Sequence, residues 1–126
     1  MNVFIISVPD EPGSAARIFE VAAAAGVNIN PAYGLANGRT GILALGSPDE
    51  AGLRAALGGA GIEAQEYEGV VTEVEDRPGT GAALFRRLAD AGVDLRAAVP
   101  VGMSGGRLQL ALAATDAAGL KRALGS

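Results

Sequence analysis

The residues Asp-Glu-Pro-Gly-Ser at positions 10–14 return 66 residues later as Asp-Arg-Pro-Gly-Thr, at positions 76–80. The same spacing relates Ala-Gly-Val at 25–27 to the identical tripeptide at 91–93. Near the end of each copy, a spacing of 67 relates Ala-Gly-Leu at 51–53 to 118–120. Internal similarity at a constant spacing indicates one structural unit that is present twice.

Each copy has the pattern strand, helix, strand, strand, helix. An apolar run at 2–8 predicts a central strand. Apolar residues at helical spacing predict the next helix, which a glycine ends in each copy; they are Ile18, Ala22 and Ala25 before Gly26, and Leu84, Leu88 and Ala91 before Gly92. Strands containing Pro31 and Pro100 should lie at edges or bulges, because proline cannot donate to a ladder.

The first copy adds a strand at 62–67, and the second has no counterpart to it. We therefore expect an α+β protein of two tandem ferredoxin-like βαββαβ sandwiches, with helices on one face of each antiparallel sheet. The second sandwich should lack its last strand. The predicted domains are 1–68 and 69–126, joined near Glu68 and Gly69, where a new strand would start at 70–75.

Composition excludes several classes of function. The 10 basic and 14 acidic residues give a net charge of -4, which would repel nucleic acid and anionic membranes. The chain has no cysteine and no histidine, which argues against disulfides, thiolate or imidazole metal sites and histidine-dependent acyl transfer. No apolar run approaches the ~20 residues of a membrane helix. We expect a cytoplasmic protein with no cofactor and no bound metal.

The corner between the first strand and first helix of each copy is a candidate binding site. Proline presets the backbone, glycine allows close approach, and the helix start leaves N–H groups without partners. Such a corner can bind a ligand carboxylate through backbone donors. The alternative is that Ser14 and Thr80 simply cap their helices.

Polar residues after the first helix of each copy are a second candidate. Asn28 and Asn30 can donate and accept, and so can hold both ends of a zwitterion, whereas Asp94 suits an ammonium group and Arg96 a carboxylate. The alternative is a solvated turn.

A run of acidic residues is a weaker candidate for a cation site than for a solvated face. Its members alternate between strand faces and lack the spacing of a calcium-binding loop. They are Glu63, Glu66, Glu68, Glu73, Glu75 and Asp76.

The repeated Asp-x-Pro-Gly corner, the apolar helix and the Ala-Gly-Val-Asn/Asp-Ile/Leu exit resemble the ACT domain, a small-molecule-binding regulatory module. The resemblance covers essentially the whole chain, and the chain is similar to stand-alone double-ACT proteins of prokaryotes. It implies amino-acid binding at interfaces between ACT units, where the corner of one unit meets the exit of another. The residues implied by position are Asp10, Glu11, Pro12, Gly13, Ser14, Asn28 and Ile29 in the first copy, and Asp76, Arg77, Pro78, Gly79, Thr80, Asp94 and Leu95 in the second. Asp94 departs from the asparagine of the first copy, which argues against two identical sites.

Three functions compete on this reading. The first is a non-catalytic sensor that binds a free amino acid, forms a homodimer or higher homo-oligomer, and changes its own assembly or a partner. The second is an interaction module without a ligand, using an open sheet face on which Arg39, Gly41 and Leu43 would lie. The third is an enzyme, but no anion-cradling loop is visible, although Arg17 and Asn37 are available in isolation.

Overall fold

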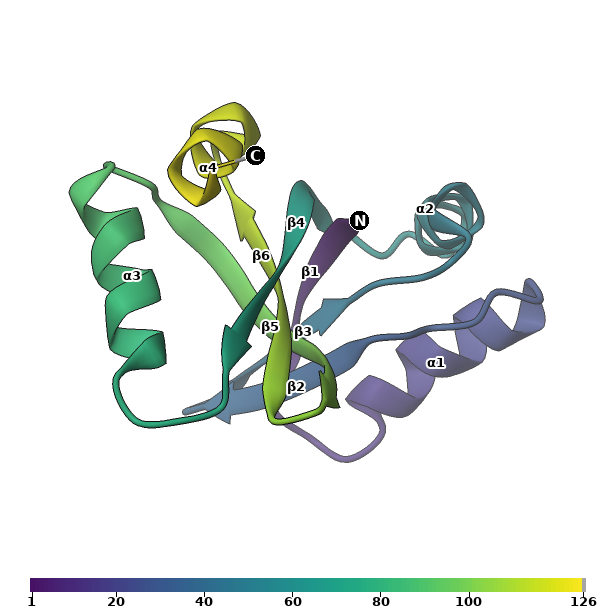
Figure 1. The fold of residues 1–126 in the computed structure, drawn as a ribbon. Helices are drawn as coiled ribbons and strands as arrows, with labels where there is room; N and C mark the ends of the chain where they lie inside the picture. The colour runs from purple at the N-terminus through teal and green to yellow at the C-terminus, as the bar shows by residue number, and fades with distance from the viewer. Residues whose placement is uncertain (126) are drawn as a thin grey trace. The chain divides into compact units, whose positions relative to one another are not determined.

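The computed structural model describes residues 1–125 and shows the predicted alternation of strands and helices (Figure 1). The elements are β1 (Asn2–Pro9), α1 (Ser14–Ala24), β2 (Ala32–Asn37), β3 (Thr40–Leu45), α2 (Glu50–Gly59), β4 (Gln65–Glu75), α3 (Thr80–Asp90), β5 (Leu95–Ser104), β6 (Arg107–Ala114) and α4 (Ala117–Leu124). Contacts divide the chain into a first unit, Asn2–Glu66, and a second unit that starts at Tyr67 and includes Met1. None of the described helices is long and apolar enough to cross a membrane.

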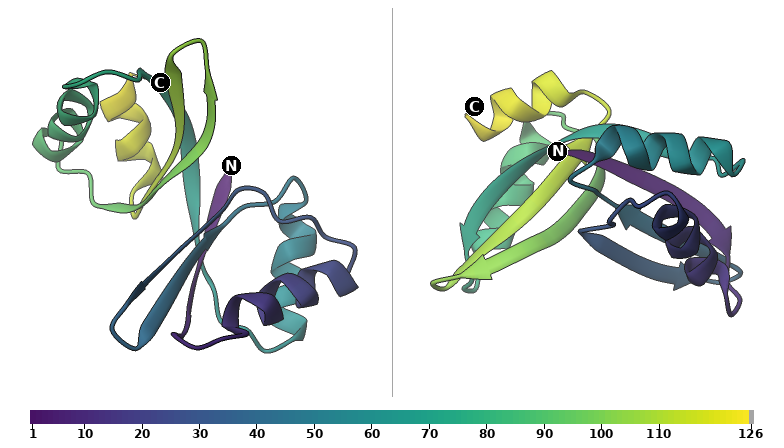
Figure 2. Two further views of the ribbon diagram at one scale, coloured as in Figure 1. Left: turned by 90° about the horizontal axis from the view of Figure 1, so that it is seen from below. Right: turned by 90° about the vertical axis from the view of Figure 1, so that its right-hand side faces the viewer.

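The first unit contains an antiparallel sheet in the order β2-β3-β1, with α1 and α2 on one face (Figure 2). Phe4 lies opposite Leu45 and Ile6 opposite Leu43, so alternate side chains face the helices. The buried core that results is Phe4, Ile6, Ile18, Ala22, Val27, Leu45, Leu53 and Leu57. Burial of this set against α1 and α2 explains why the helical spacing of apolar residues was readable in the sequence.

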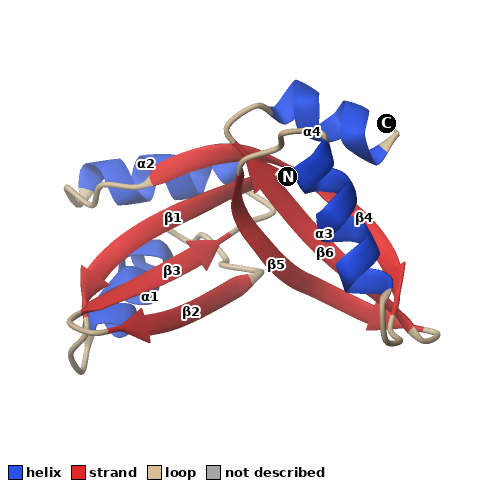
Figure 3. Cartoon of the chain, turned by 90° about the vertical axis from the view of Figure 1, so that its left-hand side faces the viewer, coloured by secondary structure: helices blue, strands red, loops and turns tan. Residues whose placement is uncertain are grey.

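The second unit repeats the arrangement in the order β4-β6-β5, with α3 and α4 on one face (Figure 3). Its buried core is Leu84, Leu88, Leu110, Leu112, Ala114 and Leu120. Pro100 lies in the outer strand β5, where the pairing register shifts between Pro100 and Gly102, as the proline predicted. Among the described residues this unit contributes three strands of its own, as expected for a copy without a final strand.

A single strand stands where two were predicted. We expected strands at 62–67 and 70–75 with a join at Glu68 and Gly69, but β4 runs from Gln65 to Glu75 without a break. Gly69 lies opposite Ala113, and it exchanges hydrogen bonds of 2.7 and 3.1 Å with the backbone carbonyl and amine of Met1. Pairing of this glycine therefore outweighs its preference for a turn. The domain boundary at 68/69 stays a prediction.

The open face of the first sheet was assigned to the wrong residues. Leu43 lies opposite Ile6 and packs against the core, whereas its neighbour Ile42 is 40% exposed. Side chains alternate along a strand, so Ile42 shares the open face with Leu35, which lies opposite it on β2. Residues 42–45 are all apolar, and such a run does not reveal which side chains face inward.

Candidate functional site

Each corner contains a glycine in the left-handed conformation. Gly13 has φ of 93° and Gly79 has φ of 91°, values that L side chains rarely adopt. Each glycine is the residue before the helix start, and its carbonyl accepts the first bond of the helix at 3.0 Å, from the N–H of Arg17 in α1 and of Ala83 in α3. The Pro-Gly pair thus turns the chain from a strand directly into a helix.

The sheet holds the other side of each corner. The N–H of Asp10 donates to the carbonyl of Arg39, and the N–H of Asp76 donates to the carbonyl of Gly106, both at 2.8 Å. These acceptors lie in the turn that follows the second strand of each unit. Backbone hydrogen bonds therefore hold each corner on both sides.

Ser14 and Thr80 do not cap their helices, which makes the capping alternative wrong. The Ser14 hydroxyl donates to the Pro9 carbonyl at 2.7 Å, and the Thr80 hydroxyl donates to the Glu75 carbonyl at 2.6 Å. Both hydroxyls thus bond back to the preceding strand, and neither glycine N-cap has a side-chain cap.

The amides that follow are open. The N–H groups of Ala15 and Ala16 in α1, and of Gly81 and Ala82 in α3, belong to a first turn that offers no intrahelical acceptor. Within residues 1–125 none of the four donates to a side chain or to a loop carbonyl. Each corner can therefore accept an anionic group.

A hollow opens beside each corner, of about 400 Å³ in the first unit and about 410 Å³ in the second. The first is lined by Glu11, Pro12, Gly13 and Ser14 of the predicted corner, together with Val8, Pro9, Arg17 and Ile18. The second takes only Arg77 and Thr80 from its corner and adds Arg87 from α3 and Arg107 from β6. Asp10, Asp76, Pro78 and Gly79 do not line either hollow.

Sequence reasoning did not assign Arg17, Arg87 or Arg107 to these hollows. Most basic side chains in residues 1–125 are in ion pairs, but those of Arg17, Arg39 and Arg87 are not. Two of these three, Arg17 and Arg87, line the corner hollows. Their positions in the helices, three and seven residues after the repeated Ser/Thr, were the available signal.

The exit of the first unit is held by backbone and hydroxyl contacts. The buried Ser47 hydroxyl donates to the Asn28 carbonyl at 2.6 Å, and the Asn30 N–H donates to the Gly46 carbonyl at 3.0 Å. The side chains of Asn28 and Asn30 stay exposed, whereas Ile29 packs against the core. Of this exit, the two asparagine side chains remain accessible to a ligand.

The exit of the second unit differs. Asp94 and Arg96, which were expected to hold opposite ends of a ligand, lie 3.4 Å from each other, and Leu95 packs against the core. A smaller hollow of about 260 Å³ lies beside this exit and is lined by Asp116 and Arg122 among others, but not by Asp94.

The corner and the exit of one unit do not come together. They lie at opposite ends of an 11-residue helix, α1 or α3, which separates them by about 16 Å at 1.5 Å per residue. One unit therefore does not bring its own corner and its own exit into a single site.

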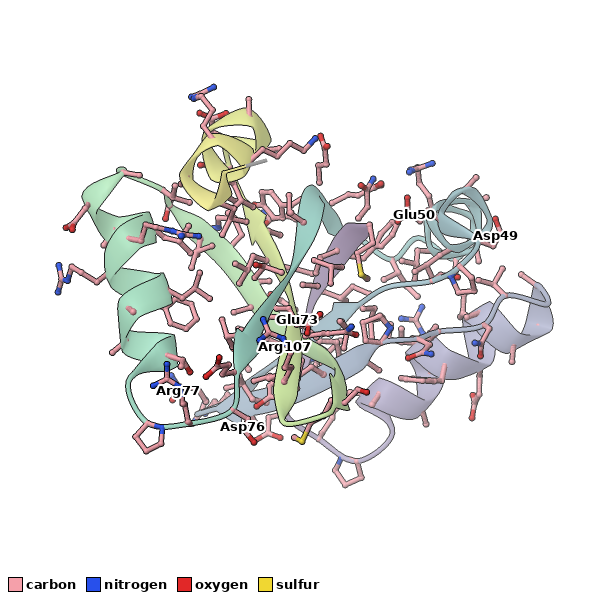
Figure 4. The ribbon with its side chains drawn as sticks, in the orientation of Figure 1. Asp49, Glu50, Glu73, Asp76, Arg77 and Arg107 are labelled. Atoms are coloured by element: carbon pink, nitrogen blue, oxygen red, sulfur yellow. The ribbon has the colours of Figure 1, made fainter. Side chains whose placement is uncertain are left out.

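The acidic run is largely ion-paired. The Arg54 guanidinium donates to Glu66 at 2.6 and 2.7 Å, and this bond lowers the pKa of Glu66 below its usual 4.5. Bonds from Lys121 and Arg77 likewise lower the pKa values of Glu68 and Glu75, and Arg107 pairs with Glu73 (Figure 4). Residues 1–125 contain no group of three or more acidic side chains that could hold a metal ion.

Comparison with known proteins addresses the fold. No family model matches the sequence, and no curated protein matches it. A solved protein of Bacteroides thetaiotaomicron is similar over 98% of this chain and 85% of its own, with a TM-score of 0.74 and 17% identity. The regulatory subunits of aspartate kinase from Thermus thermophilus, in its ligand-free form, and Thermus flavus have TM-scores of 0.60 and 0.61, with 22% identity over 98% of this chain and 89% of theirs. This chain therefore has the fold of a tandem pair of ACT domains.

Proposed function

We propose that this chain is a non-catalytic regulatory protein that binds a free amino acid at its strand-to-helix corners. The observation that carries the proposal is the pair of corner hollows, each beside a helix start with open amides and each lined by an arginine free of ion pairs, Arg17 or Arg87. The fold is shared with subunits that are named as regulatory, which agrees with this role.

The ligand carboxylate would accept from the backbone N–H groups at the start of α1 or α3 and from the nearby guanidinium. Charge-assisted bonds of this kind are about twice as strong as bonds between neutral groups. The remaining polar groups of the ligand would meet an exit from a second copy of this chain, such as the exposed side chains of Asn28 and Asn30. Binding would then stabilise one packing of units over others, which is how a ligand shifts an assembly.

Calorimetric titration of the chain with each of the twenty amino acids tests this function. At least one should bind at submillimolar to millimolar concentration, and Arg17→Gln or Arg87→Gln should weaken that binding. Arg39→Gln is the matched control, because Arg39 is also exposed and free of ion pairs but lines neither hollow. No response to any amino acid, or equal loss in the control, contradicts the proposal.

A specific surface favours a second function, that of an interaction module. Tyr33 and Leu35 on the outer strand β2 and Ile42 on β3 are 50%, 56% and 40% exposed, and alternation places all three on the open face of the first sheet. Contiguous exposed apolar side chains mark interaction sites. Light scattering of the wild type and Leu35→Ser over a range of concentrations tests it: we expect an oligomer that the substitution weakens, and a monomer throughout contradicts it.

A further inference from the structure

Three arginines from three different elements surround the hollow of the second unit. Arg77 precedes α3, Arg87 lies within α3, and Arg107 begins β6. Figure 4 shows Arg77 at the base of α3 and Arg107 beside Glu73. Since the whole chain has a net charge of -4, this hollow departs locally from the negative character of the protein.

The lining of this hollow carries one net positive charge, from three arginines and two glutamates. Arg77 pairs with Glu75 and Arg107 with Glu73, in contacts whose side chains are 44–65% exposed. Exposed pairs of this kind contribute little, so a ligand anion can replace either glutamate at small cost. Arg87 has no ion pair to break.

The hollow of the first unit provides an internal comparison. Its charged lining residues are Glu11 and Arg17, which leave it without net charge. The repeat spacing of 66 places Glu11 at the position of Arg77, and Val21 at the position of Arg87. The same spacing places Ala83 at the position of Arg17, so the two corners differ by a charge reversal on the loop and by a helix arginine that lies four residues further along in the second unit.

The cations of the second hollow are also spread along it. Arg87 follows Thr80 by seven residues in α3, which is about 10 Å along the helix axis. Arg77 lies at the corner end of the hollow, and Arg87 lies toward the other end. Two separated cations suit two separated carboxylates better than a single compact anion.

We infer that the hollow of the second unit binds a small dicarboxylate, an acidic amino acid in the first instance, and that the hollow of the first unit does not. This inference rests on the proposed function and narrows its ligand class for one of the two corners. One carboxylate lies against Arg77, and the other against Arg87.

Titration calorimetry of the full chain with L-glutamate, L-aspartate, succinate, L-alanine and inorganic phosphate tests the inference. Glutamate or aspartate should bind at least about tenfold more tightly than alanine. Arg87→Gln should weaken that binding by roughly tenfold to a hundredfold, the usual worth of a hydrogen bond to a charged group. Arg39→Gln, at an exposed arginine without an ion pair that lines neither hollow, should leave it unaltered, and added NaCl should weaken it. Circular dichroism of both variants should match the wild type, because both side chains are exposed.

The outcomes separate this inference from the proposed function. Amino acids that bind without preference for the acidic ones overturn the inference alone, as does glutamate binding that ignores Arg87→Gln. Phosphate that binds as tightly as glutamate overturns the dicarboxylate class. Arg87-dependent binding of succinate by a protein that binds no amino acid keeps the dicarboxylate hollow and removes the proposed function.

Discussion

The two corners of this protein share a backbone and differ in what surrounds it. Gly13 and Gly79 have φ of 93° and 91°, and the hydroxyls of Ser14 and Thr80 bond back to the preceding strand in the same way. The side chains lining the adjacent hollows, however, are neutral overall in one unit and cationic in the other. The shared Pro-Gly-Ser/Thr residues thus keep the same loop conformation in both units. The other residues that line the hollows differ, and they give the two hollows different net charges.

The largest expected effects concern the two cores, where the units should behave alike. Leu53 and Leu120 occupy equivalent positions and are 0% exposed. Leu53→Ala and Leu120→Ala should each reduce the free energy of unfolding by about 2–5 kcal/mol, through lost burial and the cavity left behind. Urea denaturation followed by circular dichroism measures both. A loss in either variant below about 1 kcal/mol would show that its core is not packed as described.

The corner glycines should come next. An added Cβ at Gly13 or Gly79 meets no atom within 4 Å, so the cost of Gly13→Ala and Gly79→Ala is conformational only. We expect about 1–2 kcal/mol for each, the usual penalty for a left-handed L residue. Gly58→Ala is the control, because Gly58 lies inside α2 with free space around it and alanine should add up to about 1 kcal/mol of stability there. Unequal losses at the two corners would break the equivalence of their backbones.

The caps of the closing helices should give smaller and equal effects. Asp49 accepts from the Gly52 N–H at 2.9 Å, and Asp116 accepts from the Gly119 N–H at 3.0 Å. Asp49→Ala and Asp116→Ala should each cost about 1 kcal/mol of unfolding free energy, as typical N-cap deletions do. Thermal denaturation detects both, and Asp→Asn at the same positions should retain most of the stability. A cap deletion without any cost would argue that the side chain does not hold the helix start.

The smallest effect should appear in the pH dependence of stability, through Glu66 of the first unit. The pKa of Glu66 is lowered by its bond to Arg54, so the folded state loses protons more readily than the unfolded one. The stabilisation is therefore complete above the ordinary pKa of about 4.5 and is lost as the pH falls through the lower folded value. Glu66→Gln should flatten the fall in melting temperature between pH 6 and 3 relative to the wild type. Arg54→Gln, which removes the donor of that bond, should flatten the fall in the same way, and a wild-type slope in either variant would contradict the prediction.

Much of the fold was readable because the repeat supplied each signal twice. The helices follow apolar spacing that packing then uses, as Leu84 and Leu88 show, and both prolines lie at or before outer strands. The open face of β3 was assigned wrongly, and the strands expected at 62–67 and 70–75 form the single strand β4, for related reasons. An all-apolar run hides its alternation, and the pairing of a glycine with a neighbouring strand depends on partners that are distant in the sequence.

The sequence by itself determined the two units and the glycine-containing corners, because apolar periodicity and left-handed backbone positions depend on neighbouring residues in the chain. Only the tertiary structure decided that Leu43 packs against the core, that Gly69 pairs with Met1 and Ala113, and that Arg87 and Arg107 meet at one hollow. Those outcomes depend on which strands and helices lie side by side. Packing of the whole unit sets that adjacency, and no local pattern encodes it.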